Sequence, residues 1–448
     1  MQTSGEIHLT EQLAKRYGIL GSKTVRVRAG VKTVEARLVV NEGIPAGYRL
    51  SDTLAQALHL YNRSNLRLRY DRENQALHIG PLIGILIDFL PNRQEYDPKS
   101  VQAELIYLSI LGKRLPAQYY VFTPGDINWS DQTVRGHVWV SGGRERRGWS
   151  SSIYPLPDVV YDRISTRVAQ TRNKNTRERL MSMPNLHYFN PSFLNKWRVH
   201  ELLMENPDLH AYLPETLPLN LANLELMARK YSVLYLKPCN GSLGARIIKT
   251  KATGGKLIYT VYYRGRHYGQ VDSPEELLRA TKAVRGNRAY IVQQGISLNT
   301  YNNCSFDLRI IIQKNRDGKW LISKKLARVA PRGSSITNLS RGGRAALSER
   351  VMSKVFEGSR PLIKAKNEEM RRLCLTVAKT LEASSQEIYG ELGLDIGIDK
   401  KGNLWVIEVN SKPRKTTVTS LSRAIVRNTF QRPLQYAIYL AGFSKSRK

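Results

Sequence analysis

GLDIGIDKKGNLWVIEVNSKP, residues 393–413, is the stretch of sequence that decides the fold of this chain. It predicts two β-strands joined by a tight turn that begins at Asp399, because polar residues and a glycine separate two largely apolar runs. Successive side chains of a strand point to opposite faces, so Asp395 should lie on the face opposite the apolar residues of the first strand. That apolar face would consist of Leu392, Leu394, Ile396 and Ile398.

The second strand of this hairpin carries Glu408 and Asn410, which are two residues apart and therefore share a face. The opposite, apolar face would consist of Trp405, Ile407 and Val409. With Asp395, the two polar residues would supply three oxygen ligands for Mg²⁺, which binds carboxylates and keeps positions open for phosphate. The hairpin therefore indicates a nucleotide-using enzyme. The alternative is a set of turn-associated polar residues on an exposed sheet face.

Length and composition predict a soluble, intracellular protein of several domains. The chain has 448 residues, which predicts two to four domains of roughly 100–200 residues each. Its three cysteines are odd in number and widely spaced, which argues against a disulfide framework and fits a reducing cytoplasm. The N-terminus lacks the pattern of a secretory signal. The longest apolar run, residues 79–90, is too short to span a membrane and contains a proline and an aspartate.

The charge of the chain is strongly positive. It has 70 Lys and Arg against 37 Asp and Glu, a net charge of +33. Such a field attracts polyanions, which include nucleic acid, an anionic cell-envelope polymer and acidic protein. An unspecialised basic surface is an equally good interpretation. Lys and Arg are spread along the chain without a nucleic-acid recognition module, so a specific nucleic-acid partner is not expected.

The pattern of elements predicts three domains and an α+β or α/β fold class. Residues 1–80 read as a small β-rich module with one short helix capped by Ser51. Residues 81–180 read as an α/β domain, with a buried strand at 84–90 and a helix that ends near Gly112.

Residues 181–448 mix strands and helices and carry the chemistry. We expect one helix capped by Ser192 and another capped by Ser273, with Pro274 at its first position. A long helix is expected over residues 362–383.

The segment LKPCNGSLG, residues 236–244, is a candidate phosphate-binding turn. A strand delivers Lys237, and Gly241, Ser242 and Gly244 then form a flexible turn whose backbone N–H groups can approach phosphate oxygens. Lysine supplies a point charge. The segment is not a P-loop, because the lysine precedes the glycines. An ordinary surface hairpin is the alternative.

Two arginines lie on strands that the turn NRDG, residues 315–318, should pair. Arg309 interrupts the apolar strand FDLRIIIQ, and Arg328 lies in the segment ARV of the partner strand. Both could face one anionic site and neutralise a transferring phosphoryl group. Alternatively, Arg309 is structural and pairs with Asp307 or another nearby carboxylate.

Two further segments are weaker candidates. TNLSRGG, residues 337–343, contains Asn338 and two glycines, and could form a loop that closes on phosphate or substrate; a common turn is the alternative. IVQQGI, residues 291–296, is an apolar strand that ends at a glycine. Such a strand end can offer backbone groups to an adenine edge, but a plain core strand is nearly as good an interpretation.

In this order, these segments resemble the ATP-grasp superfamily. From residue 237 to 413 they look like ligases that add glutamate to a ribosomal protein. The resemblance to the endospore coat-associated YheC/YheD-type ATP-grasp family is closer, and it covers most of the chain. It rests on FNPSFLNKW, YLPET, YLKPCNGSLG, FDLRIIIQ, LHIGPLIGIL and LPDVVYDRI.

The resemblance implies an ATP-grasp fold, in which two α+β subdomains grip ATP. It implies a pre-ATP-grasp α/β domain at 81–180, the β-rich module at 1–80, and an ATP-grasp domain at 181–448. The implied phosphate contacts are Lys196 and Lys237, beneath a mobile loop that contains Gly241, Ser242 and Gly244. The implied adenine and ribose contacts are Gln293, Gln294 and Ile296. The implied γ-phosphate and acyl-phosphate contacts are Arg309, Arg328 and Asn338. The implied Mg²⁺ ligands are Asp395, Glu408 and Asn410.

The resemblance also implies a reaction and a location. A carboxylate would attack the γ-phosphate of ATP, and an amine would capture the acyl phosphate, with ATP and Mg²⁺ as cofactors. Carboxylate and amine substrates, spore-coat proteins and an anionic polymer are the implied partners, in the cytoplasm or at the spore coat. Gln294 stands where many ATP-grasp enzymes have glutamate, and Arg414 where the ligases usually have glycine. The alternatives are a catalytically silent, nucleotide-binding coat protein and, last, a nucleic-acid-binding protein.

Overall fold

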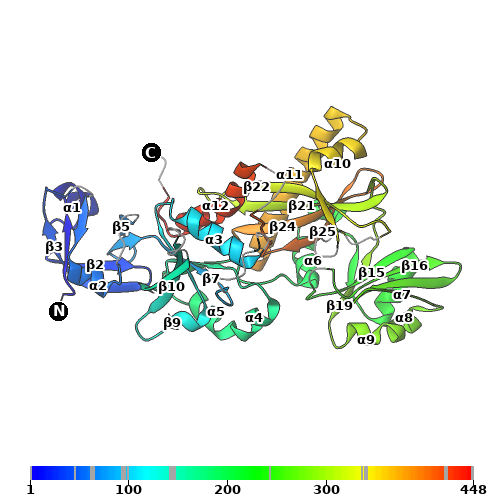
Figure 1. Ribbon diagram of the computed structural model, residues 1–448, viewed down its shortest axis with the longest axis horizontal. Coiled ribbons are helices and arrows are strands. Elements are labelled where there is room, and N and C mark those ends of the chain that lie inside the picture. Colours follow the sequence, from blue (N-terminus) through cyan, green and yellow to red (C-terminus); the bar gives the residue numbers. More distant parts are fainter. Residues whose placement is uncertain are drawn as a thin grey trace.

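Four β-sheets follow one another along the chain (Figure 1). We call them the N-terminal, second, third and fourth sheets. The computed structural model describes residues 3–44, 47–60, 66–91, 97, 100–140, 148–241, 244–333, 337, 342–417 and 422–444. Within these ranges no helix is both long and apolar enough to cross a membrane.

The N-terminal sheet is a mixed sheet that two short helices accompany. Its strands, in spatial order, are β4 (Tyr48–Leu50), β1 (Glu6–Leu9), β3 (Lys32–Val40), β2 (Thr24–Ala29), β6 (Ala76–Gly80) and β5 (Arg67–Asp71). The helices are α1 (Glu11–Tyr17) and α2 (Asp52–Ala57). The predicted cap of α2 is confirmed, because the Ser51 hydroxyl accepts a hydrogen bond from the Leu54 N–H.

The second sheet is parallel in its middle. Its strands, in spatial order, are β11 (Gly148–Pro155), β10 (Thr133–Val140), β8 (Gln118–Phe122), β7 (Leu82–Leu86), β12 (Val159–Asp162) and β13 (His187–Phe189), and β9 (Ile127–Asn128) pairs with β10. Its helices are α3 (Val101–Gly112), α4 (Arg167–Arg172) and α5 (Lys174–Met181). The predicted end of a helix at Gly112 is confirmed. The predicted strand 84–90 begins two residues earlier and ends four residues earlier than expected, because the ladder to β8 and β12 stops at Leu86.

The third sheet is antiparallel, and helices cover one of its faces (Figure 1). Its strands, in spatial order, are β14 (Thr216–Pro218), β19 (Tyr290–Gln294), β15 (Val233–Pro238), β16 (Ile247–Thr253), β17 (Lys256–Tyr262) and β18 (Arg266–Val271). The helices are α7 (Leu221–Lys230), α8 (Pro274–Ala280) and α9 (Lys282–Arg285). The cap of α8 is confirmed, because Ser273 accepts a hydrogen bond from the Glu276 N–H and Pro274 is the first helical residue.

The fourth sheet is antiparallel and packs against an extensive apolar core. Its strands, in spatial order, are β23 (Arg344–Ala346), β22 (Trp320–Val329), β21 (Cys304–Lys314), β24 (Glu391–Ile398) and β25 (Leu404–Asn410), and β20 (Thr300–Tyr301) pairs with β21. The helices of this core are α6 (Lys196–Met204), α10 (Ser348–Val355) and α11 (Arg360–Ser385). The long helix predicted at 362–383 is therefore confirmed.

The hairpin of β24 and β25 confirms the central prediction and corrects one detail. Residues 392, 394, 396 and 398 lie in one apolar core, as expected. A β-bulge interrupts the register: Asp395 pairs with Glu408, but Ile396 pairs with Val406, so Ile407 is the extra residue. The predicted apolar face of the second strand is therefore wrong. Val409 lies in the core, whereas Ile407 lines the same cavity as Glu408.

The predicted cap at Ser192 is also wrong. Helix α6 begins at Lys196, and Asn195 caps it by accepting hydrogen bonds from the N–H groups of Trp197 and Arg198. The Ser192 hydroxyl instead donates to the carboxylate of Glu387. Asparagine and serine are both good caps, so the sequence allowed either residue.

Helix α12 (Arg423–Leu440) joins the second sheet to the fourth. It contacts α3 and β12 of the second sheet, and β21 and β22 of the fourth (Figure 1). The end of the chain thus returns to an earlier part of the fold. The domain boundaries expected near residues 80 and 180 stay a prediction.

Candidate active site

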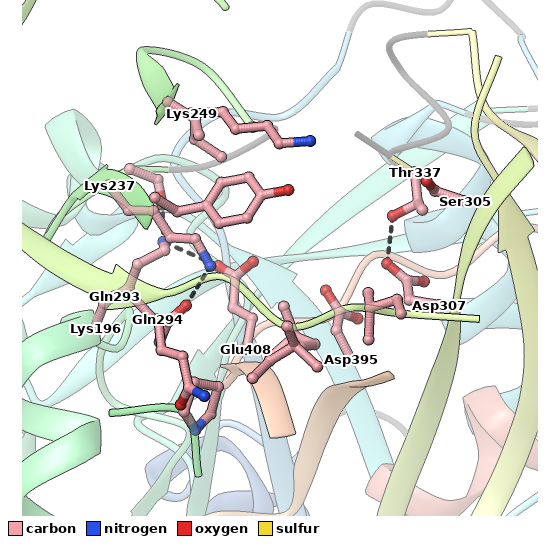
Figure 2. Close-up of a pocket in the computed structure, with 18 of the residues that line it drawn as sticks. Lys196, Lys237, Lys249, Gln293, Gln294, Ser305, Asp307, Thr337, Asp395 and Glu408 are labelled. Atoms are coloured by element: carbon pink, nitrogen blue, oxygen red, sulfur yellow. Dashed lines mark hydrogen bonds and ion pairs between the residues drawn. The ribbon is translucent and has the colours of Figure 1, made fainter. Parts of the chain in front are cut away.

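A cavity of about 310 Å³ lies between the third and fourth sheets. The third sheet contributes Tyr235, Lys237, Ile247, Lys249, Gln293 and Gln294 to its lining. The fourth sheet contributes Ser305, Phe306, Asp307, Arg328, Asp395, Ile407 and Glu408. Figure 2 shows basic side chains on one side of this space and carboxylates on the other. The segment 236–244 and the hairpin 393–413, far apart in sequence, therefore face one shared cavity.

The basic side of the cavity is built by a strand and a helix N-terminus. β15 delivers Lys237, whose Nζ donates to the side-chain oxygen of Gln293. Lys196, the first residue of α6, donates from Nζ to the carbonyl oxygen of Gly241 at 2.9 Å and forms an ion pair with Glu408 at 3.0 Å. Gly244 also lines the cavity and has a φ of 66°, a conformation that favours glycine. Both predicted lysines thus meet the glycine segment here.

Burial of the ammonium group lowers the pKa of Lys237 to about 8. The charge of Glu408 opposes this shift, and the charge of Lys196 adds to it. An anion placed beside this ammonium group would favour its protonated form.

The acidic side of the cavity is held by arginines. Asp395 lies opposite Arg309 in the ladder of β21 and β24, and Arg309 Nη2 is 3.0 Å from Asp395 Oδ2. Arg328 Nη2 is 2.8 Å from the same oxygen. Burial alone would raise the pKa of Asp395, but the two guanidinium groups outweigh it and hold the pKa below its usual value. Asp395 is therefore ionised and fixed in place.

Arg328 bridges two carboxylates. Its Nε donates to Asp307 Oδ1 at 2.7 Å, and Thr337 also donates to Asp307. Burial, together with the charge of Asp395, raises the pKa of Asp307 despite Arg328. Arg328 lines the cavity, whereas Arg309 lies behind Asp395 and is not among the lining residues. The structural alternative for Arg309, pairing with a nearby carboxylate, is what the geometry shows.

The donor set at Asp395 and Glu408 fits Mg²⁺. The two carboxylates lie directly opposite each other on paired strands, and both line the cavity. Mg²⁺ usually binds through one or two carboxylates and takes its other ligands from phosphate and water. Asn410 follows two residues later, opposite Gly393, and is not part of the lining. In the described part of the chain, no three His, Cys, Asp or Glu side chains are grouped as a metal site.

The remaining predicted residues line the cavity or lie outside the residues that the structure describes. Gln293, Gln294 and Ile296 all line the cavity, and the side-chain oxygen of Gln294 accepts a hydrogen bond from the Glu215 N–H. Ser242 and Asn338 lie outside the described residues.

Tyr235 and Lys249 are among the lining residues that sequence reasoning missed. They pair across β15 and β16, and Figure 2 shows that Lys249 extends over the same space as Lys237. The sequence signal for these two residues is only the alternation that places residues 235, 237, 247 and 249 on one face of the sheet. This alternation can be recognised only once the strand pairing is known.

Behind the site, a buried charge cluster centres on Glu391 at the start of β24. Its carboxylate accepts hydrogen bonds from the Tyr161 hydroxyl, from Arg163 Nη1 at 2.9 Å and from Gln313 Nε2 at 2.8 Å. Lys415 Nζ is 2.7 Å from its second oxygen. The cluster ties the second sheet to the segment that follows β25.

A second buried pair fixes the same segment. Lys412 Nζ is 2.6 Å from Asp162 Oδ1, and Arg177 Nε donates to the other oxygen of Asp162 at 3.1 Å. Burial lowers the pKa of Lys412 to about 8, although Asp162 opposes the shift. Arg414, which departs from the pattern of the ligases, is exposed between two buried lysines. Sequence patterns gave no sign of this network, because its partners come from distant elements.

Comparison with known proteins agrees with this geometry. Residues 185–440, more than half of the chain, match the model of the family described as YheC/D like ATP-grasp. The chain belongs to this family. Its fold is therefore the ATP-grasp fold, as the sequence resemblance predicted, and the matched range includes every candidate site residue.

Two curated proteins of Bacillus subtilis (strain 168) are similar to the chain. Endospore coat-associated protein YheD is 27% identical over 418 residues, which cover 92% of this chain and 90% of YheD. Endospore coat-associated protein YheC is 26% identical over 352 residues, which cover 76% of this chain and 94% of YheC.

Solved structures show weaker likeness. D-alanyl-alanine synthetase A from Vibrio cholerae aligns with a TM-score of 0.46 and 13% identity, over 82% of this chain and 98% of the synthetase. D-cycloserine synthetase DcsG aligns with a TM-score of 0.47 and 12% identity, over 80% of this chain and 99% of DcsG.

Proposed function

We propose that this protein is an ATP- and Mg²⁺-dependent ligase that joins a carboxylate to an amine through an acyl phosphate. One observation carries the proposal. A single cavity between two sheets has Lys196 and Lys237 on one side, and Asp395, Glu408 and Arg328 on the other. Cations suited to phosphate thus face carboxylates suited to a divalent cation.

The proposed roles follow from the positions of the side chains. Lys237 and Lys196 would bind the phosphates of ATP, close to the backbone of Gly241. Asp395 and Glu408 would hold Mg²⁺, which supplies charge neutralisation at the phosphates when it is bound. Arg309 would position Asp395 from behind. Asn410 and Asn338 remain candidates for the metal and γ-phosphate sites.

The proposed reaction has two steps. A carboxylate oxygen attacks the γ-phosphorus, the bond between the γ-phosphorus and the bridging oxygen breaks, and ADP leaves. The amine nitrogen then attacks the acyl carbon, phosphate leaves, and the nitrogen loses a proton. Arg328 lines the cavity and would stabilise the charge of the transferring phosphoryl group. Gln293, Gln294 and Ile296 also line the cavity and would hold adenine and ribose.

The location is part of the proposal. The similar proteins YheD and YheC are named as endospore coat-associated. We infer a role in forming the spore coat, with synthesis in the cytoplasm. The net charge of +33 favours an anionic partner at that surface.

Binding and turnover should be measured separately. We expect Mg-ATP to raise the melting temperature of the full chain, because a ligand that binds the folded state stabilises it. Incubation with candidate acids and amines should then release ADP. Stabilisation without ADP release from any mixture would favour a catalytically silent coat protein. If Mg-ATP neither stabilises the chain nor binds to it in calorimetry, the proposal is wrong.

The affinity for Mg-ATP should fall at alkaline pH. Lys237 has a pKa of about 8, so most molecules carry its charge at about pH 7 and few do at about pH 9. If the charged form binds phosphate, the association constant should fall about tenfold over this range, following the charged fraction. Titration calorimetry at both pH values measures the change. In the Lys237→Arg variant, the association constant should change little between the two pH values. If it falls as much as in the native chain, Lys237 is not the cause of the pH dependence.

A further inference from the structure

The face of the third sheet that lines the cavity extends well beyond it. Leu234, Leu236 and Ile248 lie on the other face, in the core covered by α7 and α8. Alternation therefore places residues 235, 237, 247 and 249 on the cavity face. The register carries this face across β17 to the edge strand β18.

Cross-strand rows connect the cavity to the sheet edge. One row runs from Lys249 through Thr260 to Tyr268, and the next runs from Lys251 through Ile258 to Gln270. A third row runs from Ile247 through Tyr262 to Arg266. Since Ile247 and Lys249 line the cavity, each of these two residues begins a row that leads outward from it. We call this surface the open face.

The charged side chains of the open face are all positive. The six strands of the third sheet contain no aspartate or glutamate. The Lys and Arg residues of these strands all lie on the cavity side of the sheet: Lys237, Lys249, Lys251, Lys256 and Arg266. Such a surface attracts anions.

Little in the described part of the chain neutralises this charge. Lys256 lies 3.4 Å from Asp272, beyond the end of β18. Within the described ranges, no ion pair joins Lys249, Lys251 or Arg266 to a carboxylate. Arg266 donates to the carbonyl oxygen of Gly333 at 3.2 Å.

The open face also has exposed apolar groups among its cations. Ile258 is 44% exposed and Tyr268 is 71% exposed. Large apolar side chains beside unneutralised lysines suit a partner that combines negative charge with side-chain contacts. An acidic polypeptide has both properties.

We propose that the open face binds an acidic polypeptide segment and leads one of its carboxylates into the cavity. This inference rests on the proposed function, because that reaction consumes a carboxylate. From β15 to β18 the face spans three strand spacings, roughly 14 Å, which an extended segment of about four residues covers. A nucleic acid would complement the positive charge of the open face but would bring no carboxylate to the phosphoryl group. The substrate class is therefore a polypeptide rich in glutamate or aspartate.

The test uses a fluorescent oligoglutamate peptide and the full chain, with binding followed by fluorescence anisotropy. The double variant Lys251→Glu/Arg266→Glu reverses two charges of the open face outside the cavity. We expect it to bind the peptide at least about tenfold more weakly than the native chain. The matched control is Lys282→Glu/Arg288→Glu, on and just after α9 across the sheet, which changes the net charge equally. It should bind nearly as the native chain does, and native binding should weaken as salt is added.

Three results would overturn the inference. The first is that the native chain does not bind oligoglutamate. The second is that the control variant loses as much peptide affinity as Lys251→Glu/Arg266→Glu. The third is that a single-stranded oligonucleotide binds more tightly than the peptide and that this binding depends on Lys251 and Arg266. Stabilisation by Mg-ATP is measured in parallel and should survive in both double variants. If Mg-ATP does not bind but peptide binding still depends on Lys251 and Arg266, the open face is confirmed as a peptide-binding surface. The proposed function is then wrong.

Discussion

Replacing Glu408 by glutamine is expected to reduce Mg-ATP turnover at least about a hundredfold while the fold stays intact. Glu408 lies opposite Asp395 on paired strands, and both side chains line the cavity between the third and fourth sheets. The amide of glutamine keeps the size of the side chain but loses the charge that would hold Mg²⁺ beside the phosphates. The folded state should tolerate the change, because the side chain is only partly buried and forms an ion pair with the partly buried Lys196.

The measurement is ADP release at saturating Mg-ATP, with circular dichroism and the melting temperature as checks on folding. Glu368→Gln is the matched control, since Glu368 is an exposed residue of α11 that pairs with Arg371. It should keep native turnover. Turnover of Glu408→Gln within a few-fold of the native rate would remove Glu408 from the site.

Replacing Glu391 by leucine is expected to destabilise the protein by about 3–5 kcal/mol. Its carboxylate is fully buried and meets Arg163, Lys415, Tyr161 and Gln313. Removing this buried acid leaves the Lys415 ammonium group without its ion-pair partner, although Arg163 keeps its ion pair with Glu104. An uncompensated buried charge costs more free energy than the intact pair contributes. The effect should be far larger than that of a surface ion pair.

Urea unfolding of the native and Glu391→Leu chains measures this loss. Glu369→Leu on α11 serves as a comparison, because Glu369 is more exposed and its ion pair is with Lys366 of the same helix. We expect a shift of about 1 kcal/mol or less for that variant. Similar midpoints for both variants would show that the cluster does not hold the second and fourth sheets together.

Local chemistry made much of the fold predictable. Ser51 and Ser273 cap the helices that follow them, since a hydroxyl before a helical run satisfies free N–H groups. Asp399 begins its turn, and its carboxylate accepts hydrogen bonds from the N–H groups of Lys401 and Asn403. The alternation of β24 was also recognisable, because successive side chains of a strand point to opposite faces.

Features that depend on pairing partners were not predictable. The bulge at Ile407 shifts the alternation of β25 by one residue, and nothing in the letters WVIEVN signals it. Ser192 and Asn195 are equivalent caps by type, and the position of Asn240 and Glu387 beside them decides between the two. Such choices depend on contacts between residues that are far apart in the sequence.

The candidate site divides in the same way. Lys237, Asp395 and Glu408 stand in recognisable segments, so the sequence predicted that they would meet, and they line one cavity. Arg309 pairs with Asp395 and is not among the lining residues, a position that only side-chain geometry shows; its role towards the phosphates stays a prediction. Lys249 stands in no such segment, because its place follows from the register of β15 and β16.

The most direct test is a crystal structure of the full chain with Mg²⁺ and a nonhydrolysable ATP analogue. We predict that the triphosphate lies in the cavity between Lys237 and the pair Asp395 and Glu408, with adenine toward Gln294. An analogue bound elsewhere, or a triphosphate that contacts neither the lysine nor the carboxylates, would contradict the account.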